Sequence, residues 1–138
     1  MYGNVWAWAG AFSLEYNRRL GVDANQIESE LRILCDNVAY RIKHDSRPDK
    51  VELLAEYHHR LTVIHPFPNG NGRWARLMTD LLAGKIEMLA LAWGGHPTAN
   101  HALHSVSAVA RDAYVEALRS ADRHDHEPLI ALIRAWSV

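Results

Sequence analysis

The sequence has little of several features that mark particular protein classes. Its one cysteine, Cys35, allows no disulfide within the chain, and the helical pattern around it predicts a reduced, partly buried thiol. Fifteen Lys and Arg nearly balance sixteen Asp and Glu, which gives a net charge of −1 and no basic excess for nucleic acid. No apolar run approaches the roughly 18 residues of a membrane span, and the start resembles no signal peptide. We therefore expect a soluble, cytoplasmic protein that binds neither nucleic acid nor a membrane.

What the sequence does contain is enough apolar material for one folded unit. At 138 residues and 49% hydrophobic content, it fits a single domain over 1–138 without internal repeats or linkers. The chain starts inside an aromatic helical pattern with no capping residue before it. We therefore expect a domain without the N-terminal extension of longer relatives.

Apolar residues recur every three to four positions over most of the chain, which predicts helices. Only residues 11–22 are expected to be extended, as a small hairpin or flap. Asp23 is the predicted N-cap of the first helix, and Gly84 is the predicted stop of the third. The expected helices cover residues 23–44, 49–64, 74–83, 103–117 and 127–136. The predicted fold class is therefore all-α, a helical bundle with one irregular loop.

The loop "HPFPNGNGRWAR", residues 65–76, carries the chemistry. Gly70 and Gly72 at the start of a helix allow backbone N–H groups to approach an anion, and the helix dipole adds to this attraction. Arg73 and Arg76 lie three residues apart, so both guanidinium groups can close over a di- or triphosphate. His65, on the opposite side of the loop, could accept a proton from a hydroxyl near neutral pH.

Each of these signals is weak alone, because most glycine loops before helices are ordinary turns and most histidines before proline only end a helix. Seven specified letters at fixed spacing, however, have a chance probability on the order of 10⁻⁹ per start position at about 5% usage each. The pattern as a whole therefore favours a phosphate site.

The loop resembles the signature of Fic-domain proteins, which reads His-Pro-Phe-x-(Asp or Glu)-Gly-Asn-Gly-Arg-x-x-Arg. The segments "VWAWAGAF", "RRLGVDANQI", "EYHHRLTVIHPFPNGNGR" and "YVEALRSADRHDHEPLIALI" extend the resemblance over nearly the whole chain. They are most similar to the bacterial branch called mobile mystery protein B. The resemblance implies a Fic-fold helical bundle with a short β-hairpin flap and a central helix-loop-helix active-site motif. It also implies transfer of AMP from ATP to a Ser, Thr or Tyr hydroxyl of a target protein.

The resemblance assigns a role to each motif position. His65 would be the general base, and Phe67 would anchor the loop in the core. The remaining motif residues would bind the nucleotide phosphates, with the anion hole at Gly70, Asn71 and Gly72 and the clamp at Arg73 and Arg76. The flap would dock the target by backbone pairing, through residues Asn17, Arg18, Arg19, Leu20, Gly21 and Val22.

The sequence departs from the family pattern at Asn69, where an Asp or Glu would hold Mg²⁺. An amide oxygen brings no charge, so Asn69 is expected to be a weak metal ligand and ATP to supply most of the Mg²⁺ binding. No glutamate is followed by Gly or Asn, as the inhibitory helix of many Fic proteins requires. Restraint would then come from a partner such as an antitoxin protein, from a missing N-terminal segment, or from the weak metal site.

Three other functions remain open from the sequence. A protein kinase like the related Doc toxins is one, although that branch alters "GNGR", which is intact here. A second is an idle nucleotide-binding module controlled by a partner, which Asn69 favours. A metallohydrolase is the third, but His58, His59 and His65 lack a carboxylate pair, so His58 and His59 are expected at the core edge. Trp93 and the other tryptophans are expected in packing, and Tyr114 either in the core or beside the adenine.

Overall fold

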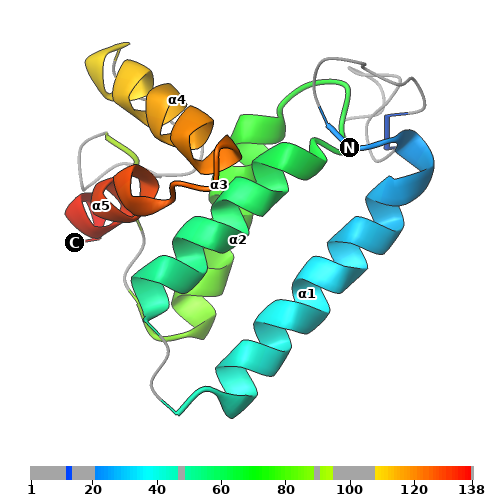
Figure 1. Cartoon of the computed structure of the whole chain (residues 1–138), viewed down its shortest axis with the longest axis horizontal. Helices are drawn as coiled ribbons and strands as arrows, with labels where there is room; N and C mark the ends of the chain where they lie inside the picture. Colours follow the sequence, from blue (N-terminus) through cyan, green and yellow to red (C-terminus); the bar gives the residue numbers. More distant parts are fainter. Residues whose placement is uncertain (1–11, 14–20, 47–48, 89–90, 95–107, 138) are drawn as a thin grey trace, which may run out of the picture.

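The central helix of the fold is α2 (Lys50–Ile64), and the other helices pack around it. Figure 1 shows α1 (Ile27–His44) along one side of α2 and α5 (Glu127–Trp136) on the other, with α3 (Asn71–Lys85) antiparallel to α2 and α4 (Ala108–Asp122) beside α5. The computed structural model describes residues 12–13, 21–46, 49–88, 91–94 and 108–137. Within them the fold is all-α, as predicted; the expected β-hairpin flap falls mostly on residues that lie outside these ranges.

The helices fall where the sequence pattern predicts them, although α3 begins earlier, at Asn71, and α4 ends later, at Asp122, than expected. Two end signals are also corrected. Asp23 makes no side-chain cap bond, and a 3₁₀ turn, η1 (Ala24–Gln26), comes before α1, so the helix begins at Ile27. Gly84 does not end α3, because a glycine with ordinary helical φ can continue a helix. The helix instead ends at Lys85, and Glu87 turns away with φ +58°. Asp49 caps α2 by accepting bonds from Val51 N–H and Glu52 N–H.

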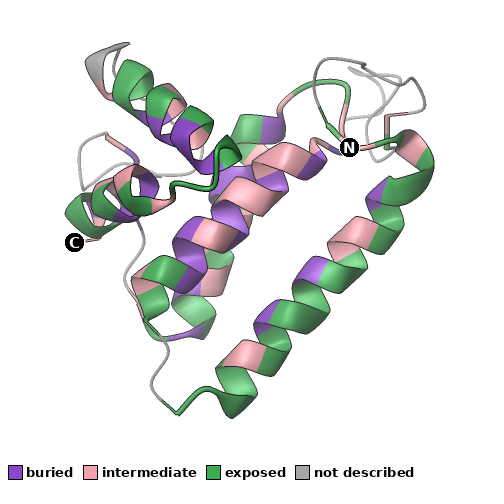
Figure 2. Cartoon of the chain, viewed as in Figure 1, coloured by how far each residue is buried: buried purple, intermediate pink, exposed green. Residues whose placement is uncertain are grey.

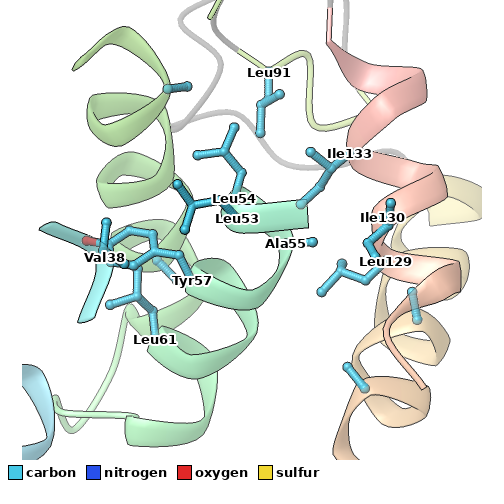
Figure 3. Packing of buried hydrophobic residues seen from close by; sticks show 14 of the residues in the cluster. Val38, Leu53, Leu54, Ala55, Tyr57, Leu61, Leu91, Leu129, Ile130 and Ile133 are labelled. Carbon is cyan, nitrogen blue, oxygen red and sulfur yellow. The ribbon is translucent and has the colours of Figure 1, made fainter. Parts of the chain in front are cut away.

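The hydrophobic core lies between α2 and its neighbours. Figure 3 shows Leu53, Leu54, Tyr57 and Leu61 of α2 between Val38 of α1 and the apolar side of α5. Beyond α3, an antiparallel bridge joins Leu91 to Ser137 and carries Trp93 into the core beside Trp136. The prediction that tryptophans pack is therefore confirmed for these two, whereas Trp6 and Trp8 lie outside the described residues.

The outer face of α1 is largely exposed (Figure 2), and this corrects two expectations. Cys35 is exposed and not partly buried. Ile42, predicted to lie on the apolar side, is also exposed, as are Leu77 and Leu81 of α3. Helical periodicity identifies an apolar stripe, but it does not predict how much of that stripe a neighbouring helix covers. None of the helices in the described ranges is long and apolar enough to cross a membrane.

Candidate active site

His65 lies where α2 ends, and its backbone is what ends the helix. It adopts the left-handed conformation, with φ +50° and ψ +56°, while its N–H still bonds to the carbonyl of Leu61. This agrees with the expectation that a residue before proline leaves the right-handed α region. The half-buried side chain of His65 therefore stands at the junction of α2 and the loop that leads to α3.

Asn71 holds the loop closed through its side chain. Its Oδ1 accepts the N–H of Phe67 at 2.8 Å, and its Nδ2 donates to the carbonyl of the same residue at 2.6 Å. Phe67 in turn packs edge-on against Trp74 and also contacts Phe12. Because the Asn71 side chain is buried and bonded at both amide atoms to Phe67, its role is to hold the loop, and its backbone N–H is the group that can serve the anion hole that the sequence predicts.

The start of α3 has the features of an anion-binding helix terminus. Gly70 is the N-cap, with φ +83°, and no side chain caps the helix there. The first backbone bond within α3 is donated by Trp74 to Gly70, which leaves the N–H groups of Asn71, Gly72 and Arg73 without an intrahelical acceptor. Such N–H groups and the positive end of the helix dipole attract phosphate.

The two arginines of the motif lie over this terminus but differ in environment. A Cβ added at Gly72 would lie 3.6 Å from Nη1 of Arg76, and one at Gly70 would lie 3.7 Å from Nη2 of Arg73. Arg73 is exposed, whereas Arg76 is only 9% exposed and its buried Nε has no hydrogen-bond partner among the described residues. None of the ion pairs among the described residues involves either arginine.

A buried network of polar side chains, His58, Thr79 and Tyr114, lies next to Arg76, and sequence reasoning did not find it. Tyr114 of α4 is hydrogen-bonded at 2.7 Å to Nε2 of His58, and its hydroxyl is close enough to the Arg76 guanidinium for the two groups to interact electrostatically. The other ring nitrogen of His58, Nδ1, lies 2.9 Å from the hydroxyl of Thr79 on α3. The available signal in the sequence was that His58 precedes His65 by seven residues, about two helical turns, which places it on the same side of α2. The sequence does not show that α4 packs against this side.

Burial keeps His58 and Tyr114 of this network neutral near pH 7. It lowers the pKa of His58 to about 3, and the positive charge of Arg76 adds to the effect, while the Ala75 carbonyl opposes it. Burial also raises the pKa of Tyr114 to about 12, although Arg76 acts in the opposite direction. Near neutral pH, Arg76 is therefore a buried cation surrounded by neutral partners.

A cavity of about 400 Å³ opens beside the loop, in the size range of small-molecule sites. It brings together the end of α2, the start of α3 and one side of α4, and α4 is far from the other two in the sequence. Its lining comprises Gly21, Thr62, Val63, His65, Asn71, Gly72, Tyr114, Leu118 and Asp122. Tyr114, which the sequence placed in the core or beside a base, is both buried and part of this lining.

The segment before α1 is attached to the backbone around His65. Val22 N–H donates to the carbonyl of Ile64 at 3.3 Å, and Ser13 N–H donates to that of Pro66 at 2.8 Å. Of the predicted flap residues, Gly21 and Val22 therefore lie at the site. Asn17, Arg18, Arg19 and Leu20 lie outside the described residues.

The described residues do not build a metal site of their own. No group of three or more His, Cys, Asp or Glu side chains within them could hold a metal ion. Asn69 is exposed, and its Oδ1 already accepts the N–H of Gly70 at 2.7 Å. This oxygen keeps one lone pair and carries no charge, so Asn69 could add at most one weak contact to an Mg²⁺ that arrives with a nucleotide.

The other histidine of the pair, His59, points to a different partner. Its Nε2 lies 2.8 Å from the Asp122 carboxylate of α4, and its ring meets His126 edge-on. His59 therefore lies at the edge of the core, as the sequence predicted, whereas His58 is fully buried within it. In the described part of the chain neither belongs to a metal cluster.

Comparison with known proteins identifies one family. The family model described as "Fic/DOC family" matches residues 16–83, which include α1, α2, the loop and most of α3. No curated protein matches the chain. The matched range contains His65, the glycine loop and both arginines, but it ends before α4 and Tyr114.

Proposed function

Residues 16–83 place this chain in the Fic/DOC family, and on that premise we propose that it transfers AMP from ATP to a Ser, Thr or Tyr hydroxyl of a target protein. Members of this family carry out AMPylation or related transferase and kinase reactions on proteins. Within the family, we assign the chain to the mobile mystery protein B branch, because Asn69 occupies the metal-binding position of the motif.

The observation that carries the proposal is the environment of Arg76. In the described part of the chain its Nε is unpaired and it has no carboxylate partner, and a buried cation of this kind is costly unless an anion completes it. The anion that fits must also accept hydrogen bonds from the free N–H groups at the start of α3, because Arg76 lies beside them. A chain of phosphates meets both requirements at once, since its oxygens accept from backbone N–H groups and from forked guanidinium groups.

The residues of the site divide the proposed reaction among them. His65, in the lining of the cavity, takes the proton of the target hydroxyl, and that oxygen forms a bond to the α-phosphorus of ATP. The bond from the α-phosphorus to the bridging oxygen breaks, and pyrophosphate leaves. Arg73, Arg76 and the N–H groups of α3 stabilise the negative charge on the leaving group. The described residues do not form a magnesium site, so no step is assigned to the metal.

The direct test follows the two ends of ATP separately. The full chain is incubated with ATP labelled either at the α- or at the γ-phosphate, in a bacterial lysate that supplies targets. We expect only the α label on protein, and none with the His65→Asn variant. Transfer of only the γ label would instead establish a Doc-like kinase.

Asn69 favours one further candidate, an idle nucleotide-binding module that a partner such as an antitoxin controls. Calorimetric titration with ATP distinguishes it, because a module of this kind binds ATP but moves neither label. A cytoplasmic location, where ATP and protein targets are available, belongs to the same proposal.

A further inference from the structure

We infer that Tyr114 is a positioning residue, which acts with His58 and Thr79 to hold the Arg76 guanidinium at the phosphate loop. This inference rests on the proposed function, because it gives the buried arginine its task there. It also assigns a role to α4, which lies beyond the residues that match the family model.

The direction of each hydrogen bond can be worked out from the fixed end of the chain. The Ala75 carbonyl can only accept, so the Thr79 hydroxyl donates to it at 2.8 Å. The Thr79 oxygen must then accept from Nδ1–H of His58, which leaves Nε2 without a proton. The Tyr114 hydroxyl therefore donates to Nε2, and its oxygen presents lone pairs to Arg76.

This arrangement positions the Arg76 guanidinium without neutralising its positive charge. A guanidinium has five N–H donors, and a phenol oxygen occupies only part of them. A carboxylate in the place of Tyr114 would neutralise Arg76 and compete with a phosphate for it. Because His58 is also neutral, it does not repel the guanidinium, and no carboxylate among the described residues pairs with Arg76.

The ring of Tyr114 is fixed independently of its hydroxyl. It packs against Trp93 and Trp136, with ring centroids 6.4 Å and 6.2 Å away. Removing only the oxygen therefore leaves the ring in place and the core filled. Tyr57 of α2 offers a matched control, since it is equally buried but lies on the side of α2 that faces α1.

The test compares Tyr114→Phe and Tyr57→Phe in calorimetric titrations with ATP and with AMP. We expect Tyr114→Phe to weaken ATP binding about tenfold, the effect of one lost hydrogen bond to a charged group. AMP lacks the phosphates that Arg76 holds, so its affinity should not change. Tyr57→Phe should change neither affinity. An unchanged ratio of ATP to AMP affinity in Tyr114→Phe would overturn the inference.

A double-mutant cycle separates positioning from direct contact. In an Arg76→Ala background, Tyr114→Phe should cause no further loss of ATP affinity. If it still weakens ATP binding, Tyr114 touches the nucleotide itself and is not a positioning residue. Thr79→Val should reproduce part of the Tyr114→Phe effect, and Thr79→Ser, which keeps the hydroxyl, should restore the wild-type ratio.

A measurement without nucleotide keeps this inference distinct from the proposed function. The side-chain Nη–H groups of Arg76, the donors available to the Tyr114 oxygen because Nε has no partner among the described residues, should exchange slowly with water in the wild type and in Tyr57→Phe but faster in Tyr114→Phe when observed by NMR. Equal exchange in all three proteins would contradict positioning even if ATP binds. If the wild type binds no ATP, the proposed function fails. A faster exchange in Tyr114→Phe would even then show that the Tyr114 hydroxyl holds Arg76.

Discussion

Gly21 and His65 are in direct contact, so the segment before α1 is seated on the residue proposed as the base. A Cβ added at Gly21 would lie 2.9 Å from the Cβ of His65 and 3.1 Å from the carbonyl oxygen of Ile64. Gly21 also has φ +99°, where side chains are strained. The position therefore requires glycine for two independent reasons: its backbone conformation, and the lack of room for a side chain beside His65.

Gly21→Ala is expected to lower the free energy of unfolding by about 1–3 kcal/mol, the usual cost of a strained backbone position. Transfer activity should fall as well, because the crowded His65 must shift. Chemical denaturation and the α-label assay measure the two effects. Gly84→Ala is the matched control, since nothing lies within 4 Å of a Cβ there. Within a helix, it should stabilise the protein by about 0.4–1 kcal/mol. Equal stability changes in the two variants would contradict the predicted crowding.

His65→Asn should reduce transfer by on the order of 10²-fold or more, because the variant has no base for the hydroxyl proton. Asparagine is the suitable replacement, since it tolerates the left-handed backbone that His65 adopts. Nucleotide affinity and unfolding free energy should stay close to wild type. Undiminished labelling by a folded His65→Asn protein would show that the base lies elsewhere.

Asn69→Asp should lower the Mg²⁺ concentration needed for half-maximal transfer, because a carboxylate holds this hard cation better than an amide. The replacement keeps an oxygen for the bond to Gly70 N–H. Magnesium titrations of both proteins at fixed ATP provide the measurement. Identical half-saturation would mean that the metal makes no contact at this position.

The buried His58 should make stability fall in mild acid. Its pKa is about 3 in the fold, against 6.5 for the free side chain. Above pH 6.5 both states are neutral and there is no pH effect. Below it the unfolded chain binds a proton that the folded protein excludes, so stability is lost by about 1.4 kcal/mol per pH unit down to about pH 3.

His58→Gln provides the control for this slope, because glutamine cannot titrate but can bond to both Thr79 and Tyr114. Urea unfolding of both proteins at pH 7, 6 and 5 isolates the contribution of His58, since the other groups titrate alike. The stability advantage of the wild type should shrink as the pH falls. A difference that stays constant between pH 7 and pH 5 would show that the fold does not lower the pKa of His58.

The helices and the motif were determined by local sequence. Periodic apolar residues with Asp49 as cap specify α2, and the proline after His65 ends it, because these effects act within one or two turns. The loop letters likewise predict a phosphate site, since a glycine turn, a helix terminus and two arginines lie within a few residues of one another. The boundaries that failed, at Asp23 and Gly84, are also local, and there competing turn geometries differ little in energy.

Tertiary structure alone decided which side chains surround Arg76. The sequence separates His58 from Tyr114 by 56 positions, and no periodicity predicts that α4 would set a phenol against both His58 and Arg76. The same is true of exposure, since Cys35, Ile42 and Leu81 follow helical patterns yet are exposed. Burial and long-range hydrogen bonds depend on which helix faces pack together, and that choice is made by the energy of the whole core rather than by any one segment.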